Sequence, residues 1–527
     1  MPRCFLASIA LVAHVALAAR AGGAQAQPLT TADSALVGRI LLAEDARDPV
    51  SSAFGEGLGH ADARVQWLAR RALARVRDPA FAARDSFPPL PAPPAYADPS
   101  WRLRYRALAG MGSDCALLRT AMRDSSWHVR LRAMDLADAS CAFDEPLLRQ
   151  LTSWARRVPA PSAAARGTGD VPWQASSHAL VALARVAPDT ARPLLRGQAR
   201  SRVAGARLYA ARAARALHDT ATLRLLAADA DDNVREVAIE GLVVVAGHAA
   251  DDAYLAALTM RGYQAVRAAA RALAGSPRGA DAARASLDAA RRLRRDSSET
   301  SRDARMALIE RIGDVATASD ANAVADLARD FDCAVAKAAT GIARRLAALL
   351  PKRDAPFCVP LPSALPPDAV ALALGAVRQL VVTMAPASGG GSFTVQLRGD
   401  LAPLMGAHVL DLVRQGYYNG LSWHRVEPDF VIQGGSPGAN EYVGHPRYLR
   451  DELGAVPHLR GTVGMSTRGH DTGDGQWFVN LRDNPRLTRD YTIFGQLISG
   501  IDVVDGVLEG DAIARIVVRA GAPARAP

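Results

Sequence analysis

Hydrophobic and polar residues follow two different periods in the two parts of the chain. Up to about residue 350, apolar residues recur three or four positions apart with charged residues between them, as on one face of an α-helix. Beyond residue 378 the pattern alternates, as in residues 380–384 (LVVTM) and 393–397 (FTVQL) on either side of three glycines at 389–391. The pattern therefore predicts a helical part followed by a part built from short strands.

The helical part contains an internal repeat. Residues 98–108 (DPSWRLRYRAL) match residues 124–134 (DSSWHVRLRAM) at an offset of 26, and looser copies follow downstream at intervals of about 26–38 residues. A polar residue followed by an apolar residue, an arginine and a small residue is typical of one helical hairpin per repeat. The repeats resemble short HEAT-like repeats over residues 32–350. This resemblance implies an all-α superhelix whose faces bind a protein partner.

Polar residues of the repeats suggest how each helix begins. Ser100, Ser126 and Asp232 suit helix N-termini, because their side-chain oxygens can accept hydrogen bonds from free backbone N–H groups. The repeat arginines either form a ladder of ion pairs with acids of the next repeat or face a partner; they are Arg104, Arg130, Arg235 and Arg267.

A proline-rich segment separates the two parts. Six prolines lie between residues 351 and 367, and we predict a linker over residues 351–377. The C-terminal domain is expected over residues 378–520, with an amphipathic helix at about 402–414, and a disordered tail over residues 521–527.

The N-terminus has the pattern of a secretory signal. Arg3 precedes an uncharged run of 16 residues that ends at Ala19, and small residues at 24 and 26 form a cleavage site. We therefore predict a signal peptide over residues 1–26 and an exported protein, in the periplasm or secreted, without stable membrane insertion after cleavage. An uncleaved anchor is the alternative, although the run is short for a span of ~20 residues.

Four cysteines follow the predicted signal and fall into two close pairs. Cys115 and Cys141 are 26 residues apart, and Cys333 and Cys358 are 25 residues apart. Export permits both pairs to oxidise, so we predict two disulfides, with buried free thiols as the alternative. No metal site is predicted, because no C-x-x-C motif or paired histidine accompanies these residues.

Composition and charge narrow the function classes. With 527 residues, 49% hydrophobic and 22% charged, the chain is a globular protein of more than one domain. Its net charge of +10 lies upstream of the C-terminal domain, since residues 375–527 carry 14 Arg and 15 Asp or Glu. Because the basic residues upstream are interleaved with acids at helical spacing, they are typical of a solvated surface. No nucleic-acid partner is expected, and binding of another polyanion is the alternative.

Four ordered blocks in the C-terminal domain carry a family resemblance. Residues 423–435 (WHRVEPDFVIQGG) resemble the F-H-R-x-x-x-x-F-x-x-Q-G-G signature of cyclophilins, and residues 460–466 (RGTVGMS) resemble the R-G-x-x-x-M-A strand of that family. Residues 475–479 (GQWFV) resemble its G-S-Q-F-F-I core, and residues 490–504 resemble its closing blocks. This resemblance implies a closed eight-stranded antiparallel β-barrel with two helices. It also implies peptidyl-prolyl cis-trans isomerase activity on X–Pro bonds of polypeptide clients, without cofactor or metal.

The resemblance also implies roles for individual residues. Arg425 matches the catalytic arginine of the family, whose guanidinium can donate a hydrogen bond to the prolyl nitrogen during rotation. The implied substrate-binding residues are Phe430, Val431, Gln433, Arg468, Gln476, Phe478, Leu487 and Tyr491.

One departure from the family pattern leaves a second function open. Arg486 stands where cyclophilins usually place Trp, Phe or His, so the rim of the site loses an aromatic ring and gains a charge. The main hypothesis is an isomerase that assists the folding of exported proteins, with the helical repeats as a protein-interaction scaffold. The alternative is a scaffold or chaperone that binds proline peptides but turns them over poorly.

The predicted signal can be tested on protein collected from outside the cytoplasm. If the signal is cleaved after residue 26, mass spectrometry of the intact exported protein should find a chain that begins near Gln27. An exported chain that retains residues 1–26 would instead support the uncleaved anchor.

Overall fold

The computed structural model describes residues 29–77, 96–112, 114–157, 172–346 and 364–521. The predicted signal peptide, residues 351–363 of the predicted linker and the tail from residue 522 lie outside the described residues. Within the described ranges, no helix has both the length and the apolar character that crossing a bilayer requires.

The N-terminal part is helical, as the apolar spacing predicts. It begins with α1 (Thr31–Asp45), α2 (Ser52–Leu58) and α3 (Ala63–Arg77). The helices that follow are α4 (Trp101–Gly110), α5 (Cys115–Ala121), α6 (Trp127–Leu136), α7 (Glu145–Ala155), α8 (Trp173–Val186), α9 (Pro188–Gln198), α10 (Ala204–Ala216), α11 (Thr220–Leu226), α12 (Asp232–Val245), α13 (Asp251–Ala257), α14 (Tyr263–Ala272), α15 (Gly279–Arg295), α16 (Arg302–Val315), α17 (Ala321–Leu327) and α18 (Cys333–Arg345). Short 3₁₀-helices lie between some of them: η3 (Ala139–Cys141), η4 (Gly247–Ala250), η5 (Glu299–Ser301) and η6 (Ala318–Asp320).

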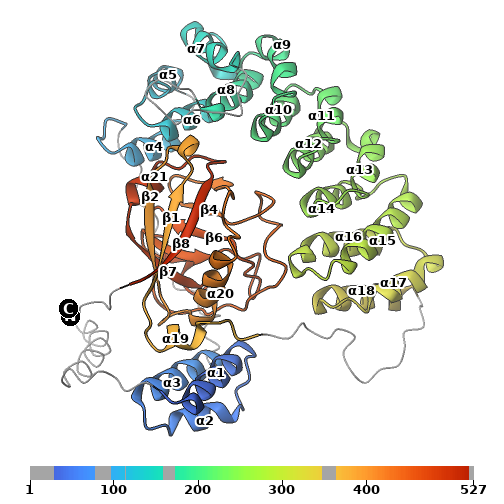
Figure 1. The fold of residues 1–527 in the computed structure, drawn as a ribbon. Helices are drawn as coiled ribbons and strands as arrows, with labels where there is room; N and C mark the ends of the chain where they lie inside the picture. The colour runs from blue at the N-terminus through green and yellow to red at the C-terminus, as the bar shows by residue number, and fades with distance from the viewer. Residues whose placement is uncertain (1–28, 78–95, 113, 158–171, 347–363, 522–527) are drawn as a thin grey trace, which may run out of the picture.

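Helices α4–α18 form an array of hairpins in two layers. Each even-numbered helix from α4 to α18 packs against the next even-numbered one, and the odd-numbered helices lie on the other side of this row. Fully buried alanines such as Ala238 and Ala269 let neighbouring helices approach closely, as expected for an alanine-rich repeat. In Figure 1 the array curves round the C-terminal domain.

The helix caps differ from the prediction made for the repeat serines. Ser100 and Ser126 do occupy N-cap positions, but neither side chain makes a capping hydrogen bond. The carboxylates of Asp98 and Asp124 instead accept from the backbone N–H groups of these serines, at 2.7 and 2.8 Å. At α12 the cap is the residue before the predicted one, Asp231. Asp98 and Asp124 therefore bond the amides of the N-cap residues, whereas Asp231 accepts from Asn233 and Val234 in the first turn of its helix.

The four repeat arginines named from the sequence differ in their contacts, and Arg130 and Arg235 donate to backbone carbonyls within their own repeats, those of Asp124 and Asp229. Arg104 pairs with Asp124 of the next repeat at 2.7 Å, and Arg207 pairs with Asp229 in the same way at 2.7 Å. These contacts form the ladder. Arg267 instead lies over the ring of Tyr442 in the C-terminal domain, 4.6 Å from the ring centre.

The C-terminal domain is a curled antiparallel sheet of eight strands. The strands are β1 (Arg378–Met384), β2 (Ser392–Leu397), β3 (Arg425–Val426), β4 (Val431–Gly434), β5 (Thr462–Met465), β6 (Trp477–Asn480), β7 (Ile493–Ser499) and β8 (Ile513–Ala520), in the order β3-β4-β6-β5-β7-β2-β1-β8. The eight antiparallel strands agree with the expectation, but the structure does not confirm the expected closure into a barrel, because the edge strands β3 and β8 are not paired as strands. The segments 420–423 and 510–513 exchange backbone hydrogen bonds near these two edges.

The C-terminal domain also contains helices, one of which the sequence predicts. The helix α20 (Pro403–Arg414) matches the predicted helix and is followed by Gly416 at a positive φ of 71°, a conformation that glycine adopts without strain. The other helical segments of the domain are α19 (Ala369–Ala373), α21 (Ile501–Asp505), η7 (Pro386–Ser388) and η8 (Pro485–Leu487). Trp423 and Trp477 are fully buried inside the sheet, with ring centres 5.1 Å apart.

The even-numbered helices form the inner row of the array, and those from α4 to α16 contact the C-terminal domain. Leu508, from the segment before β8, is part of the hydrophobic core of the array. Each even-numbered helix from α4 to α16 contributes a contact: Arg106 with Asp429, His128 with the Asp505 carbonyl, Gln174 with the Glu509 carbonyl, Tyr209 with the Glu509 carboxylate, Asn233 with the Gly438 carbonyl, Arg267 with Tyr442, and Asp303 with Arg468.

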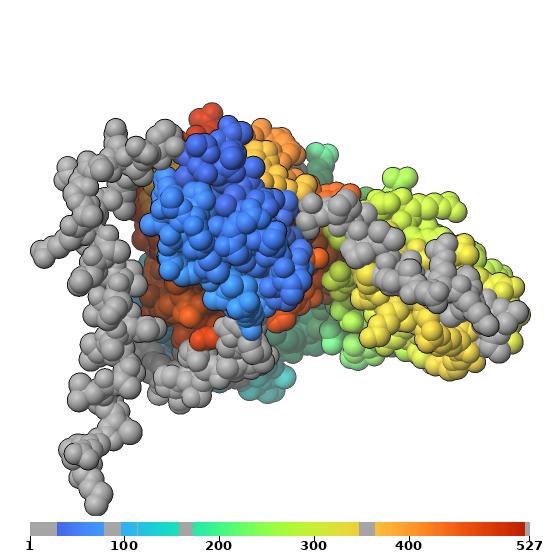
Figure 2. Space-filling view, turned by 90° about the horizontal axis from the view of Figure 1, so that it is seen from below, coloured from blue at the N-terminus to red at the C-terminus, as the bar shows by residue number. Residues whose placement is uncertain are grey.

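The first three helices lie apart from the array and share a core with the sheet. Buried residues of α1–α3, such as Val37 and Leu68, belong to the same hydrophobic cluster as the sheet residues. Polar contacts support this docking, since Arg75 donates to the Leu401 carbonyl at 2.7 Å and Arg47 donates to the Asp451 carbonyl at 2.8 Å. Figure 2 shows these helices, in blue, lying against the orange and red residues of the C-terminal domain.

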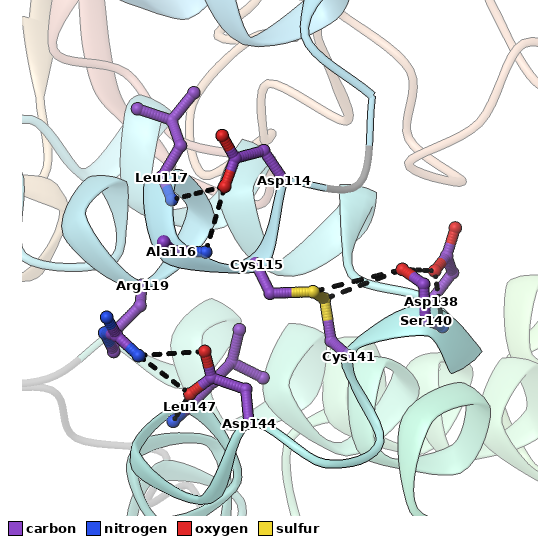
Figure 3. Close-up of a disulfide and its surroundings, with 10 residues drawn as sticks. All are labelled: Asp114, Cys115, Ala116, Leu117, Arg119, Asp138, Ser140, Cys141, Asp144 and Leu147. Atoms are coloured by element: carbon purple, nitrogen blue, oxygen red, sulfur yellow. Dashed lines mark hydrogen bonds and ion pairs between the residues drawn. A yellow bond between two sulfur atoms is a disulfide. The ribbon is translucent and has the colours of Figure 1, made fainter.

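One predicted disulfide is present in the array. Cys115 at the start of α5 is bonded to Cys141 at the end of η3, with their Cα atoms 5.5 Å apart (Figure 3). Beside it, Arg119 of α5 pairs with the Asp144 carboxylate at 2.8 Å, which joins the same two repeats. Cys333 begins α18, and its predicted partner Cys358 lies outside the described residues, so that pairing stays a prediction.

Removal of this disulfide should destabilise α5 and α6 locally. For a separation of 26 residues, loss of the loop constraint in the Cys115→Ser/Cys141→Ser protein should cost about 3.5 kcal/mol in the chain-entropy account. Native-state hydrogen exchange of the amides in α5 and α6 measures this change. Wild-type protein treated with reductant is the control, and equal protection in all three samples would contradict the prediction.

Candidate active site

Three neighbouring strands place the main candidate side chains in one row. Arg425 on β3 lies opposite Gln433 on β4, and Gln433 lies opposite Phe478 on β6. Directly opposed residues of antiparallel strands have their Cβ atoms about 4.5–5.5 Å apart and point to the same face. The pairing therefore places a cation, an amide and an aromatic ring side by side.

This row opens into a cavity of about 160 Å³. An apolar cavity of ~150 Å³ can hold a benzene ring, so a five-membered proline ring fits the space. The cavity is lined by eight of the nine residues predicted from the sequence, namely Arg425, Phe430, Val431, Gln433, Arg468, Phe478, Leu487 and Tyr491, together with Glu441, Ser466 and Thr467.

The apolar wall of the cavity is built round Phe478. Its ring is 4% exposed and lies edge-on to Tyr491, with ring centres 5.7 Å apart. Gly464 lies opposite Phe478 on β5, where any Cβ atom would collide with the ring. Glycine at this position therefore makes room for the wall.

His458 supports this wall from behind, and the sequence offers no signal for it. Its fully buried ring stacks on Phe478 at 5.7 Å, and Nε2 donates to the Tyr491 carbonyl at 3.1 Å. Burial lowers the pKa of His458 to about 4, so the ring is neutral at pH 7 and Nδ1 can accept from Asn480 at 3.2 Å. The histidine thus fixes two cavity residues without carrying charge.

The Arg425 guanidinium is oriented by neighbouring carboxylates. Its Nε and one terminal nitrogen donate to Glu427 at 2.8 and 2.5 Å. The other terminal nitrogen lies 3.4 Å from both Gln433 and Glu441, which line the cavity. Because two of the N–H groups are engaged on the outer side, the remaining edge of the guanidinium faces the cavity.

Gln476 is the predicted residue that does not line the cavity. It is buried, and its amide oxygen accepts from the Gln433 side chain at 3.3 Å. Its own nitrogen donates to the carbonyls of Glu441 and Val443, at 3.2 and 3.3 Å. Gln476 therefore orients the Gln433 amide from one step behind the cavity.

Arg486 takes a position at the rim, as its place in the sequence indicates. Its guanidinium lies 4.6 Å from the centre of the Phe430 ring, while that of Arg425 lies 5.8 Å from the same ring. Phe430 thus lies between two cations at the edge of the cavity. In place of the aromatic residue that is usual in the family, the rim has the Arg486 guanidinium stacked on the Phe430 ring.

Three lining residues were not named from the sequence. Ser466 and Thr467 directly follow the predicted R-G-x-x-x-M block, so their position at the end of β5 could have indicated them. Glu441 lies in a loop that carries no recognised motif, and its place depends on tertiary contacts. Among the residues that the structure describes, no group of three His, Cys, Asp or Glu side chains is arranged to hold a metal ion.

Comparison with known proteins identifies the family of the C-terminal domain. The model of the family "Cyclophilin type peptidyl-prolyl cis-trans isomerase/CLD" matches residues 381–518. A peptidyl-prolyl cis-trans isomerase of Helicobacter pylori (strain J99) is 35% identical over 131 residues, which are 24% of this chain and 81% of that protein. A probable peptidyl-prolyl cis-trans isomerase of Brucella suis is 36% identical over 133 residues, which are 23% of this chain and 68% of that protein.

The solved structures include a cyclophilin type peptidyl-prolyl cis-trans isomerase of Cryptosporidium parvum. It is 24% identical, with a TM-score of 0.26, and the match covers 28% of this chain and 99% of that one. Fold, site and sequence relatives together define the C-terminal domain as a cyclophilin-type peptidyl-prolyl cis-trans isomerase. The chain belongs to the family of cyclophilin-type peptidyl-prolyl cis-trans isomerases.

The Phe478 wall can be tested by shortening the side chain. Burying an apolar side chain of this size contributes about 1.5–3 kcal/mol, so Phe478→Ala should lower kcat/KM for X–Pro peptides by about 10- to 100-fold. Phe478→Leu keeps part of the apolar volume and should lose less. A protease-coupled isomerisation assay measures both, with thermal unfolding as the check on folding. A folded Phe478→Ala protein with wild-type kcat/KM would exclude this wall from proline binding.

Proposed function

We propose that the chain isomerises X–Pro bonds in exported polypeptides and so assists their folding, in the periplasm or outside the cell. Membership of the isomerase family supports the reaction. The signal-like N-terminus supports the compartment, for which the predicted start near Gln27 is the test.

The row of Arg425, Gln433 and Phe478 across three paired strands carries the proposal. Rotation about an X–Pro bond has a barrier of ~18–20 kcal/mol because the amide is conjugated. Lowering that barrier requires a donor that stabilises the nitrogen lone pair when conjugation is lost, and a wall that holds the ring. The row supplies both on one face of the sheet.

Arg425 is the proposed catalytic residue. As the amide twists, its nitrogen becomes pyramidal and gains lone-pair density, which a charged N–H donor stabilises more than it stabilises the planar amide. The edge of the guanidinium that faces the cavity can make this hydrogen bond, while Glu427 fixes the plane of the group at 2.5–2.8 Å. No proton is transferred and no covalent bond is broken.

The other cavity residues are proposed to hold the substrate during rotation. Phe478 and Leu487 offer apolar contact to the proline ring, and the Gln433 amide can bond the peptide backbone next to it. Because Gln433 is oriented by Gln476, its amide is preorganised before the client binds.

For the helical array we propose a protein-binding role of the HEAT-like kind. The contact of Arg106 with Asp429 and the contact of Asn233 with the loop before Glu441 place the inner row beside the rim of the cavity. A client that inserts a proline into the cavity would therefore extend along the inner helices. The array would contact the client's flanking residues, which favours extended chains over folded domains.

The alternative function is a scaffold that binds proline peptides with slow turnover. The specific observation in its favour is that Glu427 and Glu441 both pair with Arg425, at 2.5 and 3.4 Å. Carboxylates that engage the guanidinium compete with the prolyl nitrogen for it. Turnover by the wild-type protein decides between the two functions.

Replacement of Arg425 tests the proposed chemistry. Arg425→Ala should lower kcat/KM by about 10²–10³-fold, the scale expected for the loss of one preorganised donor. Arg425→Lys should recover little, because a point charge does not reproduce the planar fork that Glu427 orients. The measurement is the protease-coupled assay on the full chain, with KM and kcat separated.

The matched control is another arginine of the same domain. Arg398→Ala removes an exposed ion pair with Asp400 that lies outside the cavity lining, so it should leave kcat/KM within about twofold. If folded Arg425→Ala isomerised X–Pro peptides at the wild-type rate, the proposed catalytic role would be wrong. If the wild-type protein bound these peptides without measurable turnover, the scaffold function would hold.

A further inference from the structure

One corner of the helical array touches the wall of the proline cavity. The corner consists of η5 and the first turn of α16, residues 299–303. It contacts Arg468, which lines the cavity, and the loop over residues 441–448, which contributes Glu441 to the same lining. This contact joins helices outside the family domain to the active site.

Arg468 uses its donors entirely within the protein. Its acceptors are the Asp303 carboxylate at 2.6 Å, the Asp474 carboxylate at 3.1 Å, the Thr300 hydroxyl at 3.1 Å, the Tyr448 hydroxyl at 2.9 Å and the Glu441 carbonyl. A guanidinium has five N–H donors, so these five contacts account for all of them. Arg468 therefore forms part of the wall through its shape and position, and two of its five partners belong to the array.

The charge of Arg468 depends on the same neighbours. Burial alone would lower the pKa of the guanidinium, but Asp474, Tyr448 and Asp303 hold it above its ordinary value. Asp474 is itself buried, with a side chain 1% exposed. A buried cation between two carboxylates has little freedom to move, because each displacement leaves a charge unpaired.

Thr300 is the second link between the corner and the site. Its buried hydroxyl accepts from Arg468 and from the Gly444 backbone N–H, each at 3.1 Å. The hydroxyl hydrogen can bond Asp474 at 3.0 Å or the Tyr442 carbonyl at 3.2 Å. One hydroxyl thus ties together the arginine, its carboxylate partner and the 441–448 loop.

Glu299 fixes the far end of the same loop. Its backbone N–H donates to the Pro446 carbonyl at 2.8 Å, and its carboxylate accepts from the Tyr448 N–H at 2.7 Å. Inside the loop, a Cβ atom on Gly444 would collide with the Asp474 carboxylate. The loop therefore fits closely between the corner and the sheet, and its position follows that of the corner.

We infer that this corner of the array is a positioning element of the isomerase site. Through Thr300 and Asp303 it holds Arg468 and the Glu441 loop, and thereby sets the width of the proline cavity where these residues line it. The inference goes beyond the proposed function, because it gives the array a part in the activity of the isomerase domain. This part is separate from any binding of clients.

Two substitutions that keep side-chain size test the inference in the full chain. Thr300→Val removes the hydroxyl, and Asp303→Asn removes the charge that faces Arg468. Each should raise KM for an X–Pro peptide and lower kcat/KM by about 10-fold or more, since small displacements at a site can cost up to ~10²-fold. The value of kcat should change less than KM, because Arg425 is not a partner of either residue.

Conservative variants and a matched control separate positioning from general destabilisation. Thr300→Ser keeps the hydroxyl and Asp303→Glu keeps the charge, so each should recover most of the loss. Asp288→Asn makes the same change as Asp303→Asn on α15, where Asp288 is exposed and pairs only weakly with Arg291 at 3.9 Å; it should leave KM unchanged. Combining Asp303→Asn with Arg468→Gln should add little to either change alone, because both remove one interaction.

The outcomes for the Thr300 and Asp303 variants test the inference independently of the result for Arg425. Wild-type KM in folded Thr300→Val and Asp303→Asn would overturn it. A loss of activity that follows the folded fraction, with unchanged KM, would also overturn it, because the corner would then act on stability alone. If Thr300→Val does not fold, Asp303→Asn and its glutamate variant decide. Arg425→Ala is measured in parallel, so failure of the proposed catalytic role is recognised separately.

Discussion

The register of strands β3, β4 and β6 is the constraint on which the candidate site depends. On one face of these strands Ile432, Trp477 and Val479 are buried in the hydrophobic core of the domain. Their neighbours along the strands, Gln433 and Phe478, point to the opposite face and meet the cavity. A shift of one residue would exchange the two faces, so burial of the core side chains fixes the chemistry on the other side. The same alternation of side chains between the two faces of the strands therefore produces both the hydrophobic core and the site.

The helical part and the isomerase domain are packed together as one assembly. Leu508 of the isomerase domain is buried in the core of the array, and the buried residues of α1–α3 share a core with the sheet. The even-numbered helices supply ion pairs, amide contacts and ring contacts to the domain at successive points. An array of this kind usually offers its inner surface to another protein. Here each even-numbered helix from α4 to α16 already contacts the enzyme domain of the same chain.

The sequence predicted those features that depend on local patterns. The strands round residues 389–391, the helix α20 and the residues of the cavity follow from alternation, helical spacing and motif, and their positions agree with the structure. The bonds of Asp98 and Asp124 to the N-cap amides were missed because serine and aspartate both suit the helix start, and the choice depends on backbone path. The role of His458 was missed because a buried neutral histidine has no sequence signature.

Features that depend on long-range contacts could not be predicted from the sequence. The repeat pattern extends to α1–α3, yet these helices pack on the sheet, because an apolar face indicates that a helix is buried but not which partner covers it. For the same reason the family resemblance could place Arg468 at the site, whereas its bonds to Thr300 and Asp303 could be known only from the fold.

The docking of α1–α3 has a consequence for how the chain acquires its structure during synthesis. Arg47 bonds to the Asp451 carbonyl across 404 residues, and Leu68 shares its core with strands of the isomerase domain. Helices α1–α3 are made before the isomerase domain, so the apolar residues that they share with its core stay uncovered by the sheet until that domain has been made. The array between them can fold from its own neighbouring repeats, whereas the docking of α1–α3 requires the strands of the isomerase domain, so formation of that domain is the step that completes their core.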